Sequence, residues 1–161
     1  MEQNKSFHEF LLKAERFCAY QERCSYEVKQ KLKELGADEK STEKLISSLR
    51  EDDYLNDERF ALLFASGKFR IKRWGKNKIR AEIRMKKIAD SLIANALNSI
   101  NEAEYKKTIL HLIQKKEKEL RSDKSEAKKQ KIFRFILSKG FEPGNVMQVL
   151  KSPSLEERGL G

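Results

Sequence analysis

The sequence predicts an all-α protein made of three tandem three-helix repeats, each helix-turn-helix-like, in an elongated and curved array. Two observations predict this fold class. The 161 residues include only 7 Gly and 2 Pro, too few for the turns of a many-stranded β fold. Three similar segments, VKQKLKELGA, IRAEIRMKKI and IFRFILSKGF, begin at residues 28, 79 and 132, and starts 51 and 53 residues apart indicate tandem repeats.

The first repeat is predicted over residues 1–55. Ser6 and Glu9 have the spacing of a capping box, and apolar residues then recur every three or four positions, which is typical of an amphipathic helix. Gly36 can take a positive φ and so end the second helix. The three expected helices cover about residues 6–22, 25–35 and 41–51.

The second and third repeats are predicted over residues 56–101 and 102–153. Asn56 with Asp57 and Asn101 with Glu104 have side chains suited to capping the first helix of each repeat. A unit of about fifty residues buries little apolar surface alone, so neighbouring repeats are expected to stack. Residues 154–161 lack apolar periodicity and are predicted to be a disordered tail.

Charge is distributed unevenly along the chain, whose net charge is +10. Residues 1–67 hold 11 Lys and Arg against 14 Asp and Glu, whereas residues 68–161 hold 24 against 11. Such an asymmetry indicates that the second part faces an anionic partner, most often nucleic acid or a nucleoprotein.

The basic residues are densest between Lys68 and Ile88, where ten Lys and Arg accompany the single acid Glu82. Like charges at this density repel one another, and an anionic partner would relieve the repulsion. On a helix, Lys76, Arg80, Arg84 and Lys87 would form one stripe beside the buried Ile79 and Ile83. The candidate partner- or DNA-binding residues are therefore Arg70, Lys72, Arg73, Trp74, Lys76, Lys78, Arg80, Arg84, Lys86 and Lys87.

Two features of this region have alternatives. The stripe could be a merely solvated face, and Trp74 could stack on a base or plug the core at a helix junction. A second basic cluster, Lys115–Lys131, contains four acids and is a weaker candidate for extending the binding face.

The residues needed for catalysis or for holding a cofactor are missing from the pattern. His8 and His111 have no His or Cys partner at helical spacing, and no glycine-rich phosphate-binding loop is present. The acids from Glu51 to Glu58 lie between a helix end and a helix start, where they favour the helix dipole more than a metal ion. We expect neither enzymatic activity nor a cofactor or metal.

The expected location is the cytoplasm. No apolar run approaches the roughly 20 residues of a membrane span, and the first residues lack the apolar region of a signal peptide. Cys18 and Cys24 suit neither a redox pair nor a zinc site, and we expect both to be reduced.

Two classes of function fit a basic array of this kind. A helix-turn-helix DNA-binding module would use the basic helix for phosphate contacts, but Asn77 stands almost alone among base-reading residue types, so sequence-specific binding is not expected. The other class is a protein that lies along a nucleoprotein polymer and spans several of its subunits.

The sequence resembles the RecX family of bacterial recombination regulators. The resemblance rests on YLNDERFALLF at Tyr54–Phe64, on RWGKNKIRAEI at Arg73–Ile83, and on SYEVKQKLKELG and AKKQKIFRFILSKGF in the flanking repeats, and it covers roughly residues 7–150. It places Tyr54, Leu55, Asp57, Glu58, Arg59 and Phe60 in the family's central block, and Trp74, Gly75, Lys78, Ile79 and Arg80 in its basic block. Of these, the six residues of the central block together with Gly75 and Ile79 are expected to be mainly structural.

The resemblance implies a non-enzymatic negative regulator of homologous recombination, DNA repair and the SOS response. Such a protein is expected to be a monomer that binds the RecA recombinase filament, limits its extension or promotes its disassembly, and inhibits its ATPase, strand-exchange and coprotease activities. Single- or double-stranded DNA is a further expected partner. Where family members often have Lys-Gly-Ile, this chain has Lys86-Lys87-Ile88, so the helix end is expected to differ in shape there.

Overall fold

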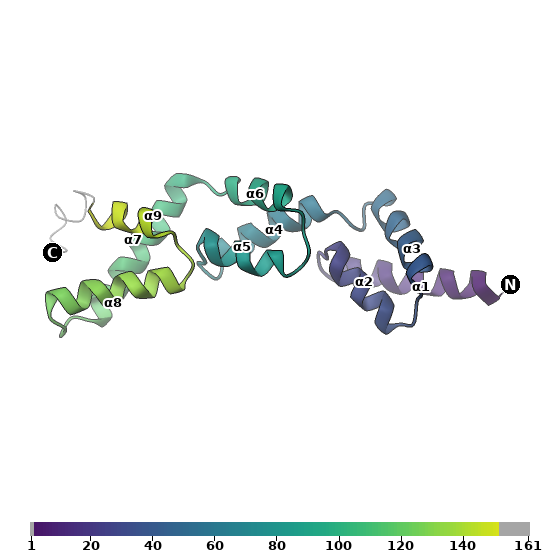
Figure 1. The fold of residues 1–161 in the computed structure, drawn as a ribbon, viewed down its shortest axis with the longest axis horizontal. Coiled ribbons are helices and arrows are strands. Elements are labelled where there is room, and N and C mark those ends of the chain that lie inside the picture. The colour runs from purple at the N-terminus through teal and green to yellow at the C-terminus, as the bar shows by residue number, and fades with distance from the viewer. Residues whose placement is uncertain (1, 152–161) are drawn as a thin grey trace. The chain divides into compact units, whose positions relative to one another are not determined.

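The computed structural model describes residues 2–151, with side chains from residue 6 onward (Figure 1). The predicted tail, residues 154–161, lies outside these described residues. Within them the chain is all-helical, as predicted, with nine helices in three consecutive groups of three. The helices are α1 (Glu2–Tyr20), α2 (Ser25–Glu34), α3 (Glu39–Glu51), α4 (Asp57–Arg70), α5 (Lys76–Arg84), α6 (Asp90–Asn98), α7 (Glu102–Glu119), α8 (Ser125–Ser138) and α9 (Pro143–Leu150).

The chain divides into two compact units. The first consists of the described residues up to Phe64 together with Ile83–Asn95, and the second of Ala65–Glu82 together with the described residues from Ala96 onward. Helices α4, α5 and α6 therefore contribute residues to both units. The repeat boundaries after residues 55 and 101 stay a prediction.

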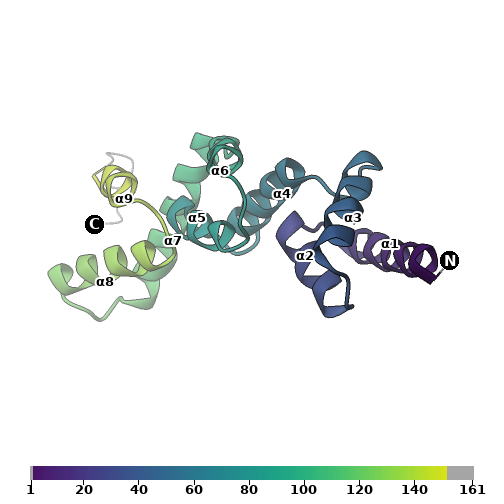
Figure 2. The same ribbon diagram turned by 45° about the vertical axis from the view of Figure 1, so that its right-hand side comes forward.

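In the first unit, α1, α2 and α3 each pack against the other two (Figure 2). Their shared core consists of Ala14, Cys18, Val28, Leu32, Leu45, Ile46, Leu49 and Leu55. The predicted capping box at Ser6 is wrong, because α1 already begins at Glu2 and Ser6 lies inside it. The side chain of Asp38 caps α3 by accepting a 2.7 Å hydrogen bond from the amide of Ser41, so that helix begins two residues before the predicted start.

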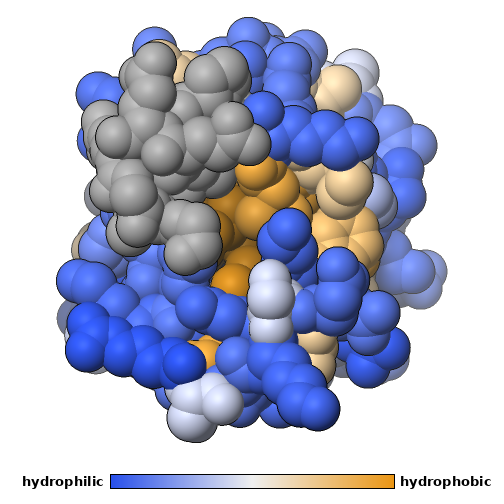
Figure 3. Space-filling model, turned by 90° about the vertical axis from the view of Figure 1, so that its left-hand side faces the viewer, coloured by the Kyte–Doolittle hydropathy of each residue, from blue (hydrophilic) through white to orange (hydrophobic). Residues whose placement is uncertain are grey.

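In the second unit, α7, α8 and α9 pack together around a core that includes an aromatic chain. The ring of Tyr105 lies 5.7 Å from the ring of Phe69 and 5.1 Å from that of Phe141, centroid to centroid. Such tilted ring pairs stabilise beyond the area they bury. Figure 3 views the chain from the end that carries α8 and α9, where an apolar area is visible among hydrophilic side chains.

The turn after α5 contains a residue with an unusual backbone conformation. Lys87 has a φ of 58°, in the left-handed region that Gly36 and Gly140 occupy after α2 and α8. The sequence predicts a different shape for this helix end, but φ is positive here as it is at the two glycines. Lys87 therefore adopts a conformation that favours glycine. Since α5 ends at Arg84, the predicted stripe is wrong in its last member, because Lys87 lies beyond the helix.

No helix in the described part of the chain combines the length and the apolar character that crossing a membrane requires.

Candidate functional site

The basic segment of the second unit centres on the turn from α4 to α5. The amide of Ile71 donates to the carbonyl of Gly67 at 2.9 Å, and the amide of Trp74 donates to that of Lys68 at 3.1 Å. Arg73, between them, has a positive φ of 55°. The end of α4 is thus closed by backbone hydrogen bonds while the turn carries cations outward.

The first amides of α5 are held by the loop between α8 and α9 and by α7. The Gly75 amide donates to the carbonyl of Lys139 at 2.8 Å, and the Asn77 amide donates to that of Gly140 at 2.9 Å. The Lys76 amide donates to the hydroxyl of Tyr105 at 3.0 Å. Because the first amides of a helix have no partner inside the helix, these contacts satisfy donors that would otherwise need water.

Two glycines make this close approach possible. A Cβ atom added to Gly75 would lie 2.2 Å from the nitrogen of Phe141, and one added to Gly140 would lie 2.3 Å from the Cβ of Lys78. Real Cβ atoms do not approach backbone so closely. The backbone of α5 can therefore reach the α8–α9 loop only if both residues lack side chains.

Tyr105 joins three elements through its hydroxyl, which also donates to the carboxylate of Glu142. Burial, and then the hydrogen bond to Glu142, raise the pKa of Tyr105 well above its usual range. Neither Tyr105 nor Glu142 belongs to a motif that the sequence alone marks as functional. No local spacing could have paired them, since they are 37 residues apart.

Cations from distant parts of the sequence gather around Lys139. Its ammonium group donates to the carbonyl of Lys72 at 3.1 Å. Burial lowers the pKa of Lys139, and the charges of Lys78, Arg73, Lys115 and Lys72 lower it further. The fold therefore adds Lys139 and Lys115 to the cations that sequence reasoning had placed around the turn.

Trp74 is half-buried between two of these cations. The ammonium nitrogens of Lys68 and Lys78 lie 4.8 Å and 4.6 Å from the centroid of its ring. Cation–π attraction of this kind fixes a ring at a partly exposed position. Trp74 is therefore not a member of the fully buried core.

Three predicted binding residues, Arg84, Lys86 and Lys87, belong to the first unit, whereas Arg70 and Arg80 belong to the second. The side chain of Arg84 lies 3.5 Å from the carboxylate of Asp90, and both are exposed. The ammonium group of Lys86 lies 3.6 Å from the carboxylate of Glu27 on α2, where both side chains are largely covered. Lys86 is therefore tied to α2, whereas Lys87 is exposed to solvent.

The central block of the motif contacts the first helices of the chain. Asp57 accepts hydrogen bonds from the amide and the hydroxyl of Ser25 at 2.8 Å and 3.0 Å, at the start of α2. Arg59 donates to the carboxylate of Glu22 at 2.9 Å and to the carbonyl of Asp53 at 3.0 Å.

The remaining motif residues divide between core and surface. Leu55, Phe60 and Ile79 are buried. Tyr54 and Glu58 are exposed.

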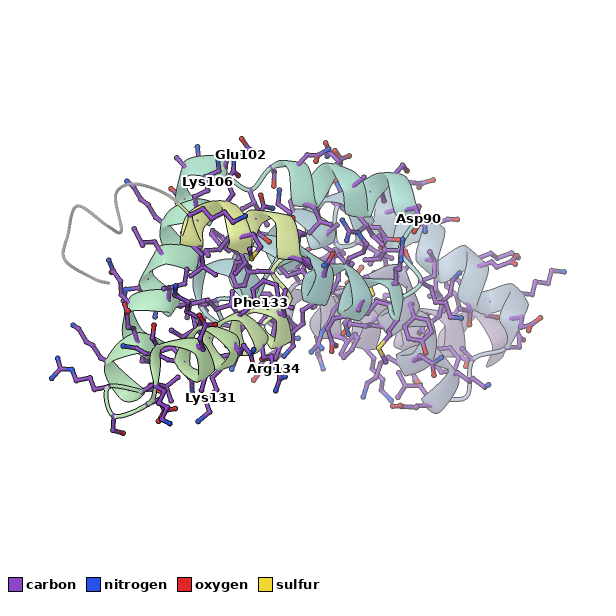
Figure 4. The ribbon with its side chains drawn as sticks, turned by 60° about the vertical axis from the view of Figure 1, so that its left-hand side comes forward. Asp90, Glu102, Lys106, Lys131, Phe133 and Arg134 are labelled. Atoms are coloured by element: carbon purple, nitrogen blue, oxygen red, sulfur yellow. The ribbon has the colours of Figure 1, made fainter. Side chains whose placement is uncertain are left out.

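The second basic cluster is paired with its own acids. Lys116 lies 3.2 Å from Glu119, and Lys128 lies 3.8 Å from Glu117 on the preceding helix. Lys131, on the side of α8 (Figure 4), lies 2.7 Å from Asp123. Much of its charge is therefore balanced locally, in contrast to the turn around Trp74. Among the side chains that the structure describes, those of residues 6–151, no three of His, Cys, Asp or Glu come together as a metal ion requires.

Comparison with known proteins identifies relatives of the chain. A family model described as the second three-helix domain of RecX matches residues 56–97. Regulatory protein RecX of Clostridium botulinum (strain Eklund 17B / Type B) is 35% identical over 127 residues, which are 78% of this chain and 59% of that protein. Regulatory protein RecX of Clostridium perfringens (strain 13 / Type A) is 33% identical over 118 residues, or 72% of this chain and 55% of that protein. The chain thus spans little more than half the length of these curated relatives.

Two solved structures share the fold. The crystal structure of RecX from Lactobacillus salivarius superposes with a TM-score of 0.87 at 22% identity, covering 92% of this chain and 96% of that one. A second structure, described as the crystal structure of regulatory protein RecX, gives a TM-score of 0.82 at 21% identity and covers 91% and 72%. At these identities the likeness establishes the arrangement of helices and nothing about binding.

Proposed function

Because the chain belongs to the RecX family of regulatory proteins, we propose that it is a negative regulator of the RecA recombinase. It binds the RecA filament on DNA and limits the extension of the filament or promotes its disassembly. Loss of filament inhibits the recombinase's ATPase, strand-exchange and coprotease activities. It thereby also lowers the rate of homologous recombination. The observation that carries the proposal is the 35% identity to a protein named for regulation.

The surface chemistry of the second unit supports a large anionic partner. The turn from α4 to α5 carries Lys72 and Arg73, and Lys139 adds a further cation, whose pKa is lowered by burial and then by the neighbouring cations. A cluster of uncompensated cations costs free energy in the unbound protein, and an anionic surface relieves that cost. A filament of recombinase on DNA offers such a surface over many subunits.

The mechanism is thermodynamic and involves no bond-making. A protein that binds a filament end, or a conformation from which subunits are lost, shifts the assembly equilibrium by the difference between its affinities for the two states. One bound molecule can then affect many subunits, since blocked extension leaves net dissociation to continue.

The test is ATP hydrolysis by RecA assembled beforehand on single-stranded DNA. We expect a progressive fall in the hydrolysis rate when the protein is present at far less than one copy per recombinase subunit and per DNA site. So few molecules cannot compete for most of the DNA. An unchanged rate until the protein saturates the DNA would contradict regulation of the filament.

A second candidate function is non-sequence-specific DNA binding by a helix-turn-helix-type module. The ten Lys and Arg between Lys68 and Ile88 favour it. Under this alternative the protein binds bare DNA with a steep dependence on salt and inhibits RecA only by occupying its DNA. Titration of a labelled oligonucleotide at several salt concentrations, beside the ATPase assay, separates the two functions.

A further inference from the structure

A small basic hollow lies in the second unit between the last turn of α4 and α7. Its volume is about 290 Å³, and it is lined by Phe69, Arg70, Arg73, Glu104, Lys107 and Thr108. Small-molecule sites usually measure about 300–1,000 Å³ and are mostly apolar, so this hollow suits one side chain better than a metabolite. Three cations and a single carboxylate line it, which favours an anionic occupant.

The cations of the hollow are unequally engaged. Arg70 lies 3.8 Å from Glu104 in an exposed pair. Arg73 and Lys107 make no hydrogen bond or ion pair with any residue that the structure describes. Arg73 is also held at a positive φ of 55°, a conformation that costs an ordinary side chain free energy and that is common at binding sites. Two charges at the hollow are thus available for a partner.

An exposed aliphatic side chain adjoins the hollow in the chain. Ile71, which lies between Arg70 and Lys72 in the chain, is 80% exposed. An isoleucine held at the tip of a turn gains nothing from water, and protein interfaces characteristically combine an apolar contact with arginines at its edge. Ile71 does not itself line the hollow, but it follows Arg70, which does, so the same short segment carries lining cations and an exposed apolar side chain.

We infer that Arg73, Lys107 and Ile71 form a docking site for an acidic protein segment that places a carboxylate in the hollow and an apolar side chain on Ile71. The inference rests on the proposed function, since the segment belongs to the recombinase. It names which part of the chain contacts the protein component of the filament and not its DNA.

Two observations favour a protein carboxylate over a nucleic acid phosphate. Single-stranded nucleic acid binds proteins by stacking bases on aromatic rings, but the only Trp of the chain already has the ammonium groups of Lys68 and Lys78 at its ring. The aliphatic Ile71 finds no counterpart on a phosphate backbone.

The test compares affinities for two partners at one salt concentration: the RecA filament assembled on saturating single-stranded DNA, and the same DNA bare. The variants are Arg73→Glu with Lys107→Glu, and Ile71→Ser. The first control is Lys106→Glu with Lys118→Glu, the same charge change at exposed positions of α7 that do not line the hollow; Figure 4 labels Lys106 near the start of that helix. The second is Met85→Ser, at an apolar side chain that is 71% exposed.

We expect both test variants to weaken filament binding about tenfold or more relative to their controls. Ile71→Ser should leave the affinity for bare DNA unchanged. Filament binding equal to that of the controls would overturn the docking site while leaving the proposed function intact. The result could also be that the double charge reversal weakens binding to bare DNA as much as binding to the filament, while Ile71→Ser changes neither affinity. That result would assign the hollow to a phosphate and overturn the inference. If the wild-type protein does not bind the filament at all, both the docking site and the proposed function are overturned. None of the other outcomes includes this loss of wild-type binding.

Discussion

The backbone amide of Gly75 donates a 2.8 Å hydrogen bond to the carbonyl oxygen of Lys139, and this bond joins the start of α5 to the end of α8. The two backbones meet without an intervening side chain, because a Cβ on Gly75 would lie 2.4 Å from the carbonyl oxygen of Gly140. The cations of the α4–α5 turn are positioned by this contact.

Substituting Gly75 by Ala should destabilise the protein by about 1–3 kcal/mol, because the added methyl group forces the α8–α9 loop away from α5. The change in the free energy of unfolding can be measured by urea denaturation. Gly67→Ala is the matched control, since a Cβ there meets nothing within 4 Å. Alanine should instead stabilise α4 at that position by up to about 1 kcal/mol. Equal effects of the two substitutions would contradict the close contact.

Removing the hydroxyl of Tyr105 should also be costly. In Tyr105→Phe the amide of Lys76 loses its acceptor and the carboxylate of Glu142 loses a donor, which should cost about 1–3 kcal/mol. Tyr20→Phe, at a ring that is 83% exposed, should change the free energy of unfolding by less than about 0.5 kcal/mol. A double-mutant cycle with Glu142→Ala, which removes the acceptor, measures the coupling between the two side chains, and additivity would show that their hydrogen bond contributes nothing.

Replacing Lys87 by Gly should stabilise the protein. The left-handed conformation at φ 58° costs a residue with a Cβ about 1–2 kcal/mol. Glycine avoids this cost, but it also gives the unfolded chain more conformational freedom, which offsets part of the gain in stability. The expected net gain is up to about 1 kcal/mol in urea denaturation. Lys87→Ala removes the same charge but keeps the Cβ, so it should give no gain. A gain of equal size in both variants would point to charge repulsion and not to backbone strain.

The two buried thiols should make stability fall at alkaline pH. Burial is the main cause that raises the pKa of Cys18 and of Cys24 from 9.0 to about 11. Between these values the unfolded chain has lost the thiol protons while the folded chain keeps them. Stability is therefore complete below pH 9 and lost as the pH rises toward 11, by at most about 1.4 kcal/mol per pH unit for each thiol. The decrease in the free energy of unfolding between pH 8.5 and pH 10.5 should be smaller in the double variant Cys18→Ala with Cys24→Ala than in the wild type. An equal decrease in both proteins would contradict burial of the thiols.

The sequence could predict those features that depend on local periodicity. Ile79 and Ile83, four residues apart, are both fully buried, as the helical pattern indicates. Gly36 and Gly140 end helices at positive φ, which only glycine adopts readily. The positive φ of Lys87 could not be predicted, because nothing in a lysine marks that conformation.

The contacts that shape the candidate site depend instead on residues far apart in the chain. The amide of Gly75 meets Lys139, and the hydroxyl of Tyr105 meets Glu142, through backbone and side-chain geometry that leaves no spacing in the sequence. Lys139 could not be assigned to the cation cluster for the same reason. The sequence shows where charged residues are dense along the chain. Which of these charges lie close together in space depends on the fold.

Reversing the charges of Arg80 and Arg84 should weaken filament binding without unfolding α5. Among the residues that the structure describes, Arg80 donates only to Asn77 on its own helix, at 2.9 Å, and Arg84 pairs only with the exposed Asp90, at 3.5 Å. Exposed pairs of this kind contribute little stability. The helical circular dichroism and the unfolding midpoint of Arg80→Glu with Arg84→Glu should therefore match the wild type.

The affinity of that double variant for the RecA filament should fall roughly tenfold, and its dependence on salt should become weaker, because two attractive charges have become repulsive. Lys124→Glu with Lys129→Glu is the matched control, since both lysines are exposed and lie in the second basic cluster. That control should lose much less affinity, because three cations of this cluster are paired with its own acids and the local excess of positive charge is smaller. Filament binding by the Arg80 and Arg84 variant that equals the wild type at physiological salt would remove this face of α5 from the binding surface and leave the α4–α5 turn as the remaining candidate.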